Sequence, residues 1–271
     1  MRKAHNLLVS VSVCSLMVAV TFVGGGGAEI DTAHVVGAWL LDENEGGVAN
    51  DASGGGNDGR LLKGAKWDAG KFGAALLFDG VDDAVQIPSS AGDKLNPDTQ
   101  ITLAAWIQRR DAQESPGYMI IGRMDTVQSR TYYLAFWQNR FQMEVSHNGT
   151  VGNRTVMESI EEIVDMEWHH LAGTYDGENM LIYVDGVPAG KAPPFIAGKG
   201  GIHQNDSDVY IGYDEVDGGL FFDGLIDEVI ILNIALAEKD IVTLMEDGLR
   251  QTLSVSPPGT LAILWATLKR S

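Results

Sequence analysis

The sequence contains almost no cysteine, and the one it has is poorly placed to act. Cys14 lies in an N-terminal leader, so a chain that has lost this leader carries no thiol at all. This excludes disulfides, zinc–thiolate sites and cysteine nucleophiles from the remaining chain. Its stability must therefore come from packing, supplemented by a hard cation if one binds.

Positive charge is also scarce. Nineteen Lys and Arg residues stand against 37 Asp and Glu residues, which gives a formal net charge of −18. A nucleic-acid partner would require a basic stripe to displace counterions, and an anionic membrane surface would repel such a chain. The acidic surplus instead favours solubility and offers carboxylate ligands for calcium.

Proline is rare and glycine is abundant. Eight prolines and 33 glycines are distributed over 271 residues, 45% of which are hydrophobic. This composition favours many short strands joined by tight turns over a helical fold. The length suits one main domain, and no internal repeat is visible.

The first 28 residues read as a secretory signal peptide. Arg2 and Lys3 precede an apolar run over residues 7–23, and small residues follow up to position 28. The alternative is an uncleaved anchor, although the run is near the lower limit for a membrane span. We expect a secreted protein that is extracellular or at the cell surface, or periplasmic in a Gram-negative cell, with no membrane insertion after cleavage.

The sequence in the middle of the chain predicts a β-meander. Residues 171–175 and 180–184 are rich in aromatic and β-branched residues and are separated by a polar turn. Asp185-Gly186 then predicts a two-residue type I′ hairpin turn, because both positions of that turn require positive φ.

The same residues carry a family resemblance. The stretch from Trp168 to Gly190, which includes WHHLAGTYDG and IYVDG, resembles the central signature of laminin-G-like domains in the concanavalin A-like lectin/glucanase superfamily. Four further segments support it in the order that the family has them: residues 36–42, 51–59, 73–80 and 224–229.

The resemblance implies an all-β, antiparallel jelly-roll sandwich. We expect twelve to fourteen strands over residues 29–250, with residues 225–232 beside residues 35–41. One short C-terminal helix is predicted at residues 235–247, ended by Gly248. Residues 42–60 form a long polar loop, pinned by its own Asp and Asn side chains or by an ion. A linker and a short tail, whose role stays open, occupy residues 251–271.

The sequence does not predict an enzyme. Laminarinase-type hydrolases of the superfamily require paired carboxyl groups on one face of a strand, and residues 161–167 do not match that spacing. His169 and His170 are neighbours on a strand and point to opposite faces, so they are poorly placed to chelate one metal ion.

A structural calcium is implied by the resemblance. In this superfamily such an ion often joins the loop after the first strand to a carboxylate on the closing strand. The matching ligands here are Asp42, the backbone of Gly47 and Asp227. Asp79 and Asp82 are further candidates, since their turn is crowded with carboxylates.

The sequence also offers a candidate carbohydrate site. Sugar rings stack on flat apolar faces, while nearby polar groups bind the hydroxyls. Trp137 is predicted at a hairpin tip beside Asn139 and Arg140, and Tyr133 lies on the same strand. We therefore expect a non-catalytic, monomeric carbohydrate-binding module. The alternative is a protein-interaction or cell-surface architecture domain without a sugar site, so the partner is a glycan or an extracellular protein.

Overall fold

The computed structural model describes residues 30–89, 94–110, 117–124, 130–191, 195–196, 200–213 and 220–254. The expected signal peptide lies outside these ranges, as does the predicted tail beyond residue 254. No helix within the described ranges is long and apolar enough to cross a membrane.

The described residues form seventeen strands, one 3-10 helix and one α-helix. In chain order these are η1 (Thr32–His34), β1 (Val35–Trp39), β2 (Val48–Ala49), β3 (Gly59–Leu62), β4 (Lys66–Ala69), β5 (Ala74–Asp79), β6 (Ala84–Ile87), β7 (Ile101–Arg109), β8 (Tyr118–Met124), β9 (Arg130–Trp137), β10 (Arg140–Ser146), β11 (Arg154–Glu158), β12 (Trp168–Tyr175), β13 (Met180–Val184), β14 (Val187–Pro188), β15 (Phe195–Ile196), β16 (Val209–Ile211), β17 (Asp223–Leu232) and α1 (Glu238–Ser254).

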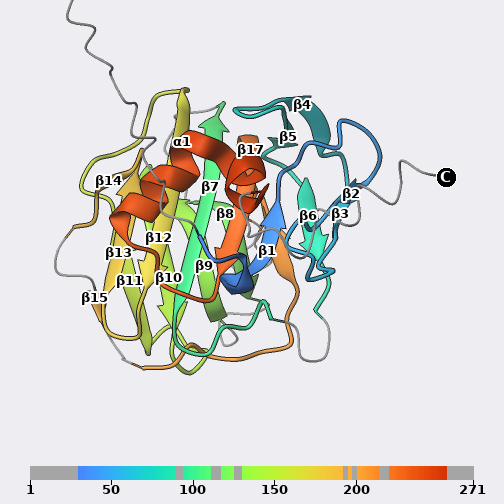
Figure 1. Cartoon of the computed structure of the whole chain (residues 1–271). Coiled ribbons are helices and arrows are strands. Elements are labelled where there is room, and N and C mark those ends of the chain that lie inside the picture. The colour runs from blue at the N-terminus through green and yellow to red at the C-terminus, as the bar shows by residue number, and fades with distance from the viewer. Residues whose placement is uncertain are drawn as a thin grey trace, which may run out of the picture.

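The strands assemble into two antiparallel sheets (Figure 1). The eight-stranded sheet has the order β14-β13-β12-β7-β17-β5-β4, and β1 pairs with β17 beside this path. The nine-stranded sheet has the order β15-β11-β10-β9-β8-β16-β6-β3-β2. The predicted sandwich is therefore confirmed, including the pairing of the closing strand β17 with the first strand β1.

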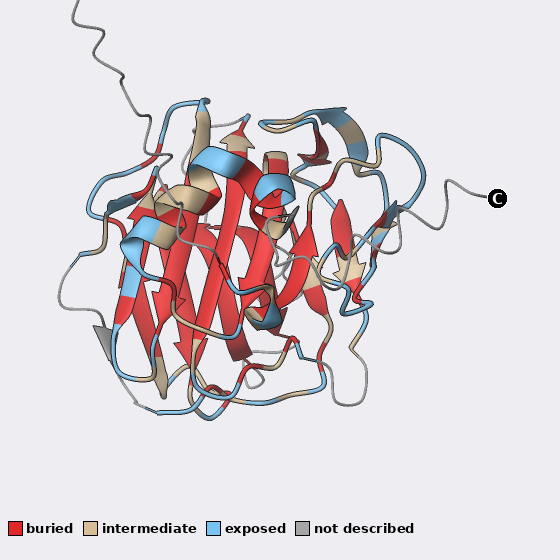
Figure 2. Cartoon of the chain, in the orientation of Figure 1, coloured by how far each residue is buried: buried red, intermediate tan, exposed pale blue. Residues whose placement is uncertain are grey.

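Apolar side chains from both sheets meet in one core. On β9, for example, Tyr132, Leu134 and Phe136 face inward, while Tyr133 and Ala135 belong to a separate cluster on the outer face. The strands at the centre of the molecule are accordingly buried (Figure 2). This alternation leaves the outer face of the nine-stranded sheet available to carry polar side chains.

Helix α1 covers the outer face of the eight-stranded sheet. Leu236, just before the helix, and Ile241, Leu244 and Leu249 within it pack against small and aliphatic residues of β1, β7, β12 and β17. The helix is kinked at Gly248, whose φ of 69° and ψ of 165° are not helical. Gly248 thus ends the predicted helix, and a further short helical segment continues to Ser254, beyond the predicted end at residue 247.

Short strands account for the difference from the predicted strand number. Strands β2, β3, β4 and β15, of two to four residues each, have too little alternation to be recognised from sequence. The loop over residues 42–60 contains β2 and is pinned by its own side chains, as expected. Asp51 accepts backbone hydrogen bonds from Ala38, Ser53 and Asn57.

Candidate functional site

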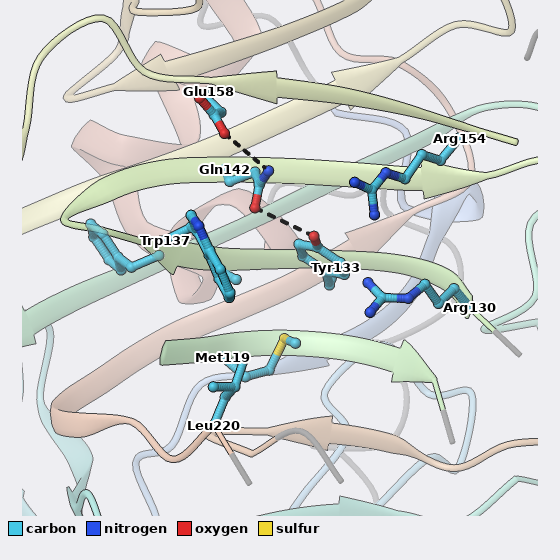
Figure 3. A pocket seen from close by; sticks show the side chains of 10 residues that line it. Met119, Arg130, Tyr133, Trp137, Gln142, Arg154, Glu158 and Leu220 are labelled. Atoms are coloured by element: carbon cyan, nitrogen blue, oxygen red, sulfur yellow. Dashed lines mark hydrogen bonds between the residues drawn. The ribbon is translucent and has the colours of Figure 1, made fainter. Parts of the chain in front are cut away.

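A pocket opens on the outer face of the nine-stranded sheet. It has a volume of about 280 Å³ and draws its lining from β8, β9, β10 and β11 and from the segment before β17. Its lining residues are Met119, Arg130, Tyr133, Ala135, Phe136, Trp137, Gln142, Arg154, Glu158 and Leu220. Figure 3 shows Trp137 at one end of this pocket and the two arginines at the other. One end is thus apolar and the other cationic.

Trp137 is held at the pocket by the tight turn between β9 and β10. Gln138 and Asn139 have φ of 48° and 63°, which is the conformation of a two-residue type I′ turn. The side chain of Trp137 remains 42% exposed, which is unusual for so large an apolar group in this molecule. An exposed indole on a rigid hairpin is available to stack against a ligand.

A buried ionic cluster forms the cationic end. Glu144 is 1% exposed, and its oxygens lie 3.4 Å from Arg130 and 3.1 Å from Arg154. The Tyr133 hydroxyl donates a 2.9 Å hydrogen bond to the same carboxylate. Burial and the charge of Glu144 raise the pKa of Tyr133 well above its usual value, so its phenol stays protonated. The cluster therefore fixes the positions of two guanidinium groups and one hydroxyl across three strands.

Hydrogen bonds continue toward the pocket rim. Gln142 accepts from the Tyr133 hydroxyl at 3.4 Å and donates to Glu158 at 3.5 Å (Figure 3). These amide, hydroxyl and carboxylate groups offer both donors and acceptors to a polar ligand. Gln142, Glu144, Arg154 and Glu158 were not among the residues predicted for the site.

The four predicted sugar-binding residues separate in the structure. Tyr133 and Trp137 line the pocket, whereas Asn139 and Arg140 are not among its lining residues. Asn139 is buried and accepts a 2.9 Å hydrogen bond from Arg109, whose guanidinium also donates to the Ile163 carbonyl. Arg140 lies 3.3 Å from Glu162 and donates to loop carbonyls. Both residues hold the hairpin tip against the loop before β12.

The predicted calcium ligands Asp42 and Asp227 both contact the backbone of residues 72–74. The backbone N–H of Phe72 donates to Asp227 at 3.0 Å, and that of Ala74 donates to Asp42 at 2.9 Å. Arg250 of α1 also donates to Asp42 at 2.7 Å. The Gly47 carbonyl accepts a 3.0 Å hydrogen bond from the backbone of Leu61 in β3.

Asp227 is a buried carboxyl with an unusual environment. It is fully buried, and its Oδ1 atom has no hydrogen-bond partner within the described ranges. Burial, with the charges of Glu228 and Asp42, raises its pKa to about 8. Burial and the charge of Asp42 raise the pKa of Glu228 to about 7. A cation beside Asp227 would relieve both effects, and the unpartnered Oδ1 atom offers it one ligand. The oxygens of Asp42, Asp227 and Glu228 do not form a group within 4.8 Å of one another.

A second acidic cluster lies at the β5–β6 turn. Asp79, Asp82 and Asp83 place one oxygen each within 4.8 Å of one another. Asp79 accepts hydrogen bonds from the turn amides of Val81 and Asp82. Burial and the neighbouring Asp79 and Asp82 raise the pKa of Asp83. Asp83 was not among the predicted ligands, and it is the buried member of this group.

The adjacent histidines occupy different environments. His170 is buried against Trp106, with ring centroids 5.4 Å apart, and burial lowers its pKa to about 4. His169 is not simply solvated, since its two ring nitrogens lie 2.8 Å from Asp185 and 2.7 Å from Asp165. It joins the loop before β12 to the β13–β14 turn.

This histidine is expected to make stability depend on pH. The hydrogen bonds to Asp185 and Asp165 outweigh burial and raise the His169 pKa from 6.5 to about 9. The folded state then binds this proton more tightly, so the stabilisation is complete below about pH 6.5 and is lost as pH rises through 9. Thermal melting of His169→Gln should lack this decline. Parallel curves for both proteins between pH 6 and 9.5 would contradict the assignment.

The sequence and the fold were compared with known proteins. The laminin-G model of the concanavalin A-like lectin/glucanases superfamily matches residues 79–242. A search of curated proteins finds no match.

Solved structures with a similar fold include toxin binding domains and a sugar-bound domain. The binding domain of Paraclostridial Mosquitocidal Protein 1 has a TM-score of 0.60 at 12% identity, over 80% of this chain and 52% of that one. The binding domain of Botulinum Neurotoxin DC in complex with SialylT has a TM-score of 0.60 at 15% identity, over 80% and 52%. The chain thus spans about half the length of these toxin domains.

The third similar structure corresponds in size to this domain. It is Domain 4 of AbnA, a GH43 extracellular arabinanase from Geobacillus stearothermophilus, in complex with arabinotriose. It has a TM-score of 0.53 at 18% identity, over 78% of this chain and 98% of that one. Identities this low establish a common fold and no more.

The family model matches more than half of the sequence, and the two antiparallel sheets agree with it. The chain therefore belongs to the laminin-G domains of the concanavalin A-like lectin/glucanases superfamily.

Proposed function

We propose that this protein is a non-catalytic carbohydrate-binding module whose site is the pocket between Trp137 and Arg154. The observation that carries this proposal is the pairing of an exposed indole with a fixed row of hydrogen-bonding side chains in one pocket. A sugar ring can stack on Trp137 while its hydroxyls bond to Gln142, Glu158 and Arg154.

The pocket chemistry suits sugars better than it suits a flat apolar ligand. Its floor contains Met119 and Ala135, but its walls carry two guanidinium groups, an amide and a carboxylate. Small-molecule sites of this kind combine an apolar surface with a few placed polar groups that set orientation. The arabinotriose complex of the arabinanase domain supports the proposal by showing that a domain of this fold and size can bind a sugar.

We also propose that the domain acts outside the cell and holds a structural calcium ion. Export rests on the predicted signal peptide and on the extracellular arabinanase among similar structures. For calcium, Asp42, Asp227 and Glu228 would supply the carboxylate oxygens. When bound, the ion would neutralise buried negative charge and fasten β17 to the loop after β1.

A second candidate function is binding to a protein. Ile160, Val164 and Met166 are all more than 45% exposed, and their loop packs against the hairpin tip that carries Trp137. Exposed apolar residues gathered at one end of a domain are typical of interaction surfaces. Their acidic neighbours, such as Glu161 and Glu162, would favour a basic partner.

A glycan array distinguishes the two functions. The wild-type domain, with calcium present, should bind a defined glycan class, with arabinotriose among the first soluble probes. Trp137→Ala should lower the affinity about tenfold or more, because a stacked aromatic ring is lost, while Trp137→Phe should retain part of it. Val187→Ala, which removes an exposed apolar residue of β14, is the control.

The array can also reject the proposal. Capture of a protein partner without any glycan binding would favour the interaction function. Undiminished glycan binding by a folded Trp137→Ala variant would place the sugar site elsewhere on the sandwich.

A further inference from the structure

The strand register places one row of side chains across the outer face of the nine-stranded sheet. Glu144 of β10 is opposite Tyr133 of β9, and Tyr133 is opposite Gly122 of β8. Gly122 is opposite Tyr210 of β16, and Tyr210 is opposite Gln86 of β6. Because directly opposed residues point to the same face, this row runs from the pocket toward β6.

Gly122 leaves the middle of this row without a side chain. A Cβ atom at this position would lie only 3.0 Å from the Tyr133 Cβ and 3.0 Å from the Met119 sulfur. The Met119 side chain of β8 therefore lies beside Gly122, and the surface between Tyr133 and Tyr210 is low and apolar. A ligand that leaves the pocket in this direction passes over the Met119 thioether and the β8 backbone.

A second aromatic cluster stands on the far side of Gly122. The rings of Tyr210 and Tyr213 are 5.2 Å apart in an edge-to-face arrangement. Tyr213 and Phe221 are stacked, with centroids 4.8 Å apart and planes 17° apart. We call these three residues the second platform. Tyr213 lies on the outer face because its ring contacts that of Tyr210. Phe221 lies on the same face because its ring stacks on Tyr213.

The pocket and the second platform are joined by apolar side chains. Leu220 lines the pocket and directly precedes Phe221. A Cβ atom on Gly117 would lie 3.1 Å from the Trp137 ring and 3.2 Å from Leu220, so these two side chains flank the same glycine. The apolar surface therefore extends from Trp137 to Leu220, and the next residue along the chain is Phe221 of the second platform.

Polar groups accompany the second platform as they accompany the first. Gln86 donates to Asp208 at 2.6 Å and to the Tyr210 hydroxyl at 3.4 Å. Asp208 also accepts a 2.7 Å hydrogen bond from the backbone of Ser89. An aromatic surface beside an oriented amide, carboxylate and phenol repeats the chemistry of the Trp137 pocket.

We propose that the sugar site extends across Gly122 to the second platform and that its ligand is an extended oligosaccharide lying across the strands. This inference rests on the proposed function. Strand β8 separates β9 from β16, so Tyr133 and Tyr210 are two strand spacings apart, roughly 10 Å. Trp137 lies four residues further along β9 and is therefore farther from the second platform. One sugar ring in the pocket does not reach that far, whereas successive rings of a chain do. Two linked contacts also strengthen binding through effective concentration.

The test compares ligand length and platform variants by calorimetry. The probes are arabinose, arabinotriose and arabinohexaose, and the protein is the full mature chain with calcium. The hexaose should bind the wild type about tenfold more tightly than the triose. Phe221→Ala and Tyr213→Ala should each abolish this gain while leaving affinity for the triose unchanged. Tyr213→Phe keeps the ring and should keep the gain, and Trp137→Ala should weaken binding at both lengths.

The outcomes separate the extension from the function on which it rests. Equal affinity for triose and hexaose in the wild type overturns the extension alone, as does a length-dependent gain that survives in Phe221→Ala and Tyr213→Ala. Failure of every probe to bind overturns both proposals for this ligand class. Melting curves identify a variant that has lost its fold, in which case the other alanine variant decides.

Discussion

In calcium-free buffer the domain is expected to lose stability steadily as the pH rises from about 4 to about 8, and added calcium is expected to restore it. The cause is the carboxyl pair on β17. Burial and neighbouring negative charge raise the pKa of Asp227 from 3.8 to about 8 and that of Glu228 from 4.5 to about 7. Both groups must lose a proton in a buried site as the pH approaches neutrality.

The direction follows from proton linkage. A carboxyl whose pKa is higher in the folded than in the unfolded state binds its proton more tightly when folded. Its stabilising contribution is complete below the unfolded value and declines as the pH rises through the folded value. For Asp227 these values correspond to a loss of about 5 kcal/mol between pH 4 and 8. A calcium ion that binds only the native state reverses this loss, so its effect on Tm should be small at pH 5 and large at pH 8.

Asp227→Asn provides the decisive comparison, because it keeps the shape of the side chain without a titrating group. We expect this variant to lose the part of the pH dependence that Asp227 contributes in chelator, to keep the smaller decline due to Glu228, and to show no response to calcium. Asp79→Asn is the matched control at the second acidic cluster and should respond to calcium as the wild type does. If Asp79→Asn loses the calcium response and Asp227→Asn keeps it, the ion binds at the β5–β6 turn instead. Identical melting of the wild type with calcium and with chelator at pH 8 would contradict a structural calcium at either place.

Glu144→Gln is expected to destabilise the domain by about 3 kcal/mol, because it removes the charge of a buried carboxylate that pairs with Arg130 and Arg154. The Arg130 side chain is only 8% exposed, and Glu144 is the carboxylate beside it and beside Arg154. The same change should weaken sugar binding, since Tyr133 and Arg154 lose the group that orients them. Urea denaturation and a binding titration measure the two effects.

Glu162→Gln is the matched control for this prediction. Its partner Arg140 is 34% exposed and Glu162 itself is 50% exposed, so loss of the pair should cost less than about 1 kcal/mol. Equal small losses of stability in Glu144→Gln and Glu162→Gln would show that the buried cluster does not organise the pocket.

The fold could be predicted from sequence to a large extent because its long strands and turns are local signals. Asp185-Gly186 predicted a type I′ turn, and the two residues have φ of 51° and 75°. The motif around Asp227 identified the closing strand, and β17 pairs with β1 as expected. Strands such as β2 and β15 were not predicted, because a segment of two residues shows no periodicity. They form through pairing, β2 with β3 and β15 with β11.

The candidate site was harder to predict because it depends on the register in which neighbouring strands pair. Trp137 and Tyr133 could be recognised as aromatics on one strand, but Glu144 comes to lie opposite Tyr133, where it holds the pocket's arginines, only once β9 and β10 are paired. Asn139 was expected at the rim because it is a turn residue, yet Arg109 from the other sheet draws its side chain inward.

Glu228 was missed for a different physical reason. Alternation along a regular strand would place it on the face opposite Asp227. A β-bulge interrupts β17 there, with a φ of 53° at Glu228, so both carboxyl groups approach Asp42. The bulge breaks the alternation on which the sequence argument relied.

The most direct test of the central claim is an NMR titration that follows the indole N–H signals of the protein as arabinohexaose is added. The Trp137 signal can be assigned by its loss in Trp137→Phe. We predict that it shifts in a saturable manner, while the signal of Trp39, whose indole is buried and hydrogen-bonded to the Asn57 carbonyl, stays in place. Saturable shifts elsewhere in the spectrum, with an unmoved Trp137 signal, would contradict the account, and so would the absence of any shift.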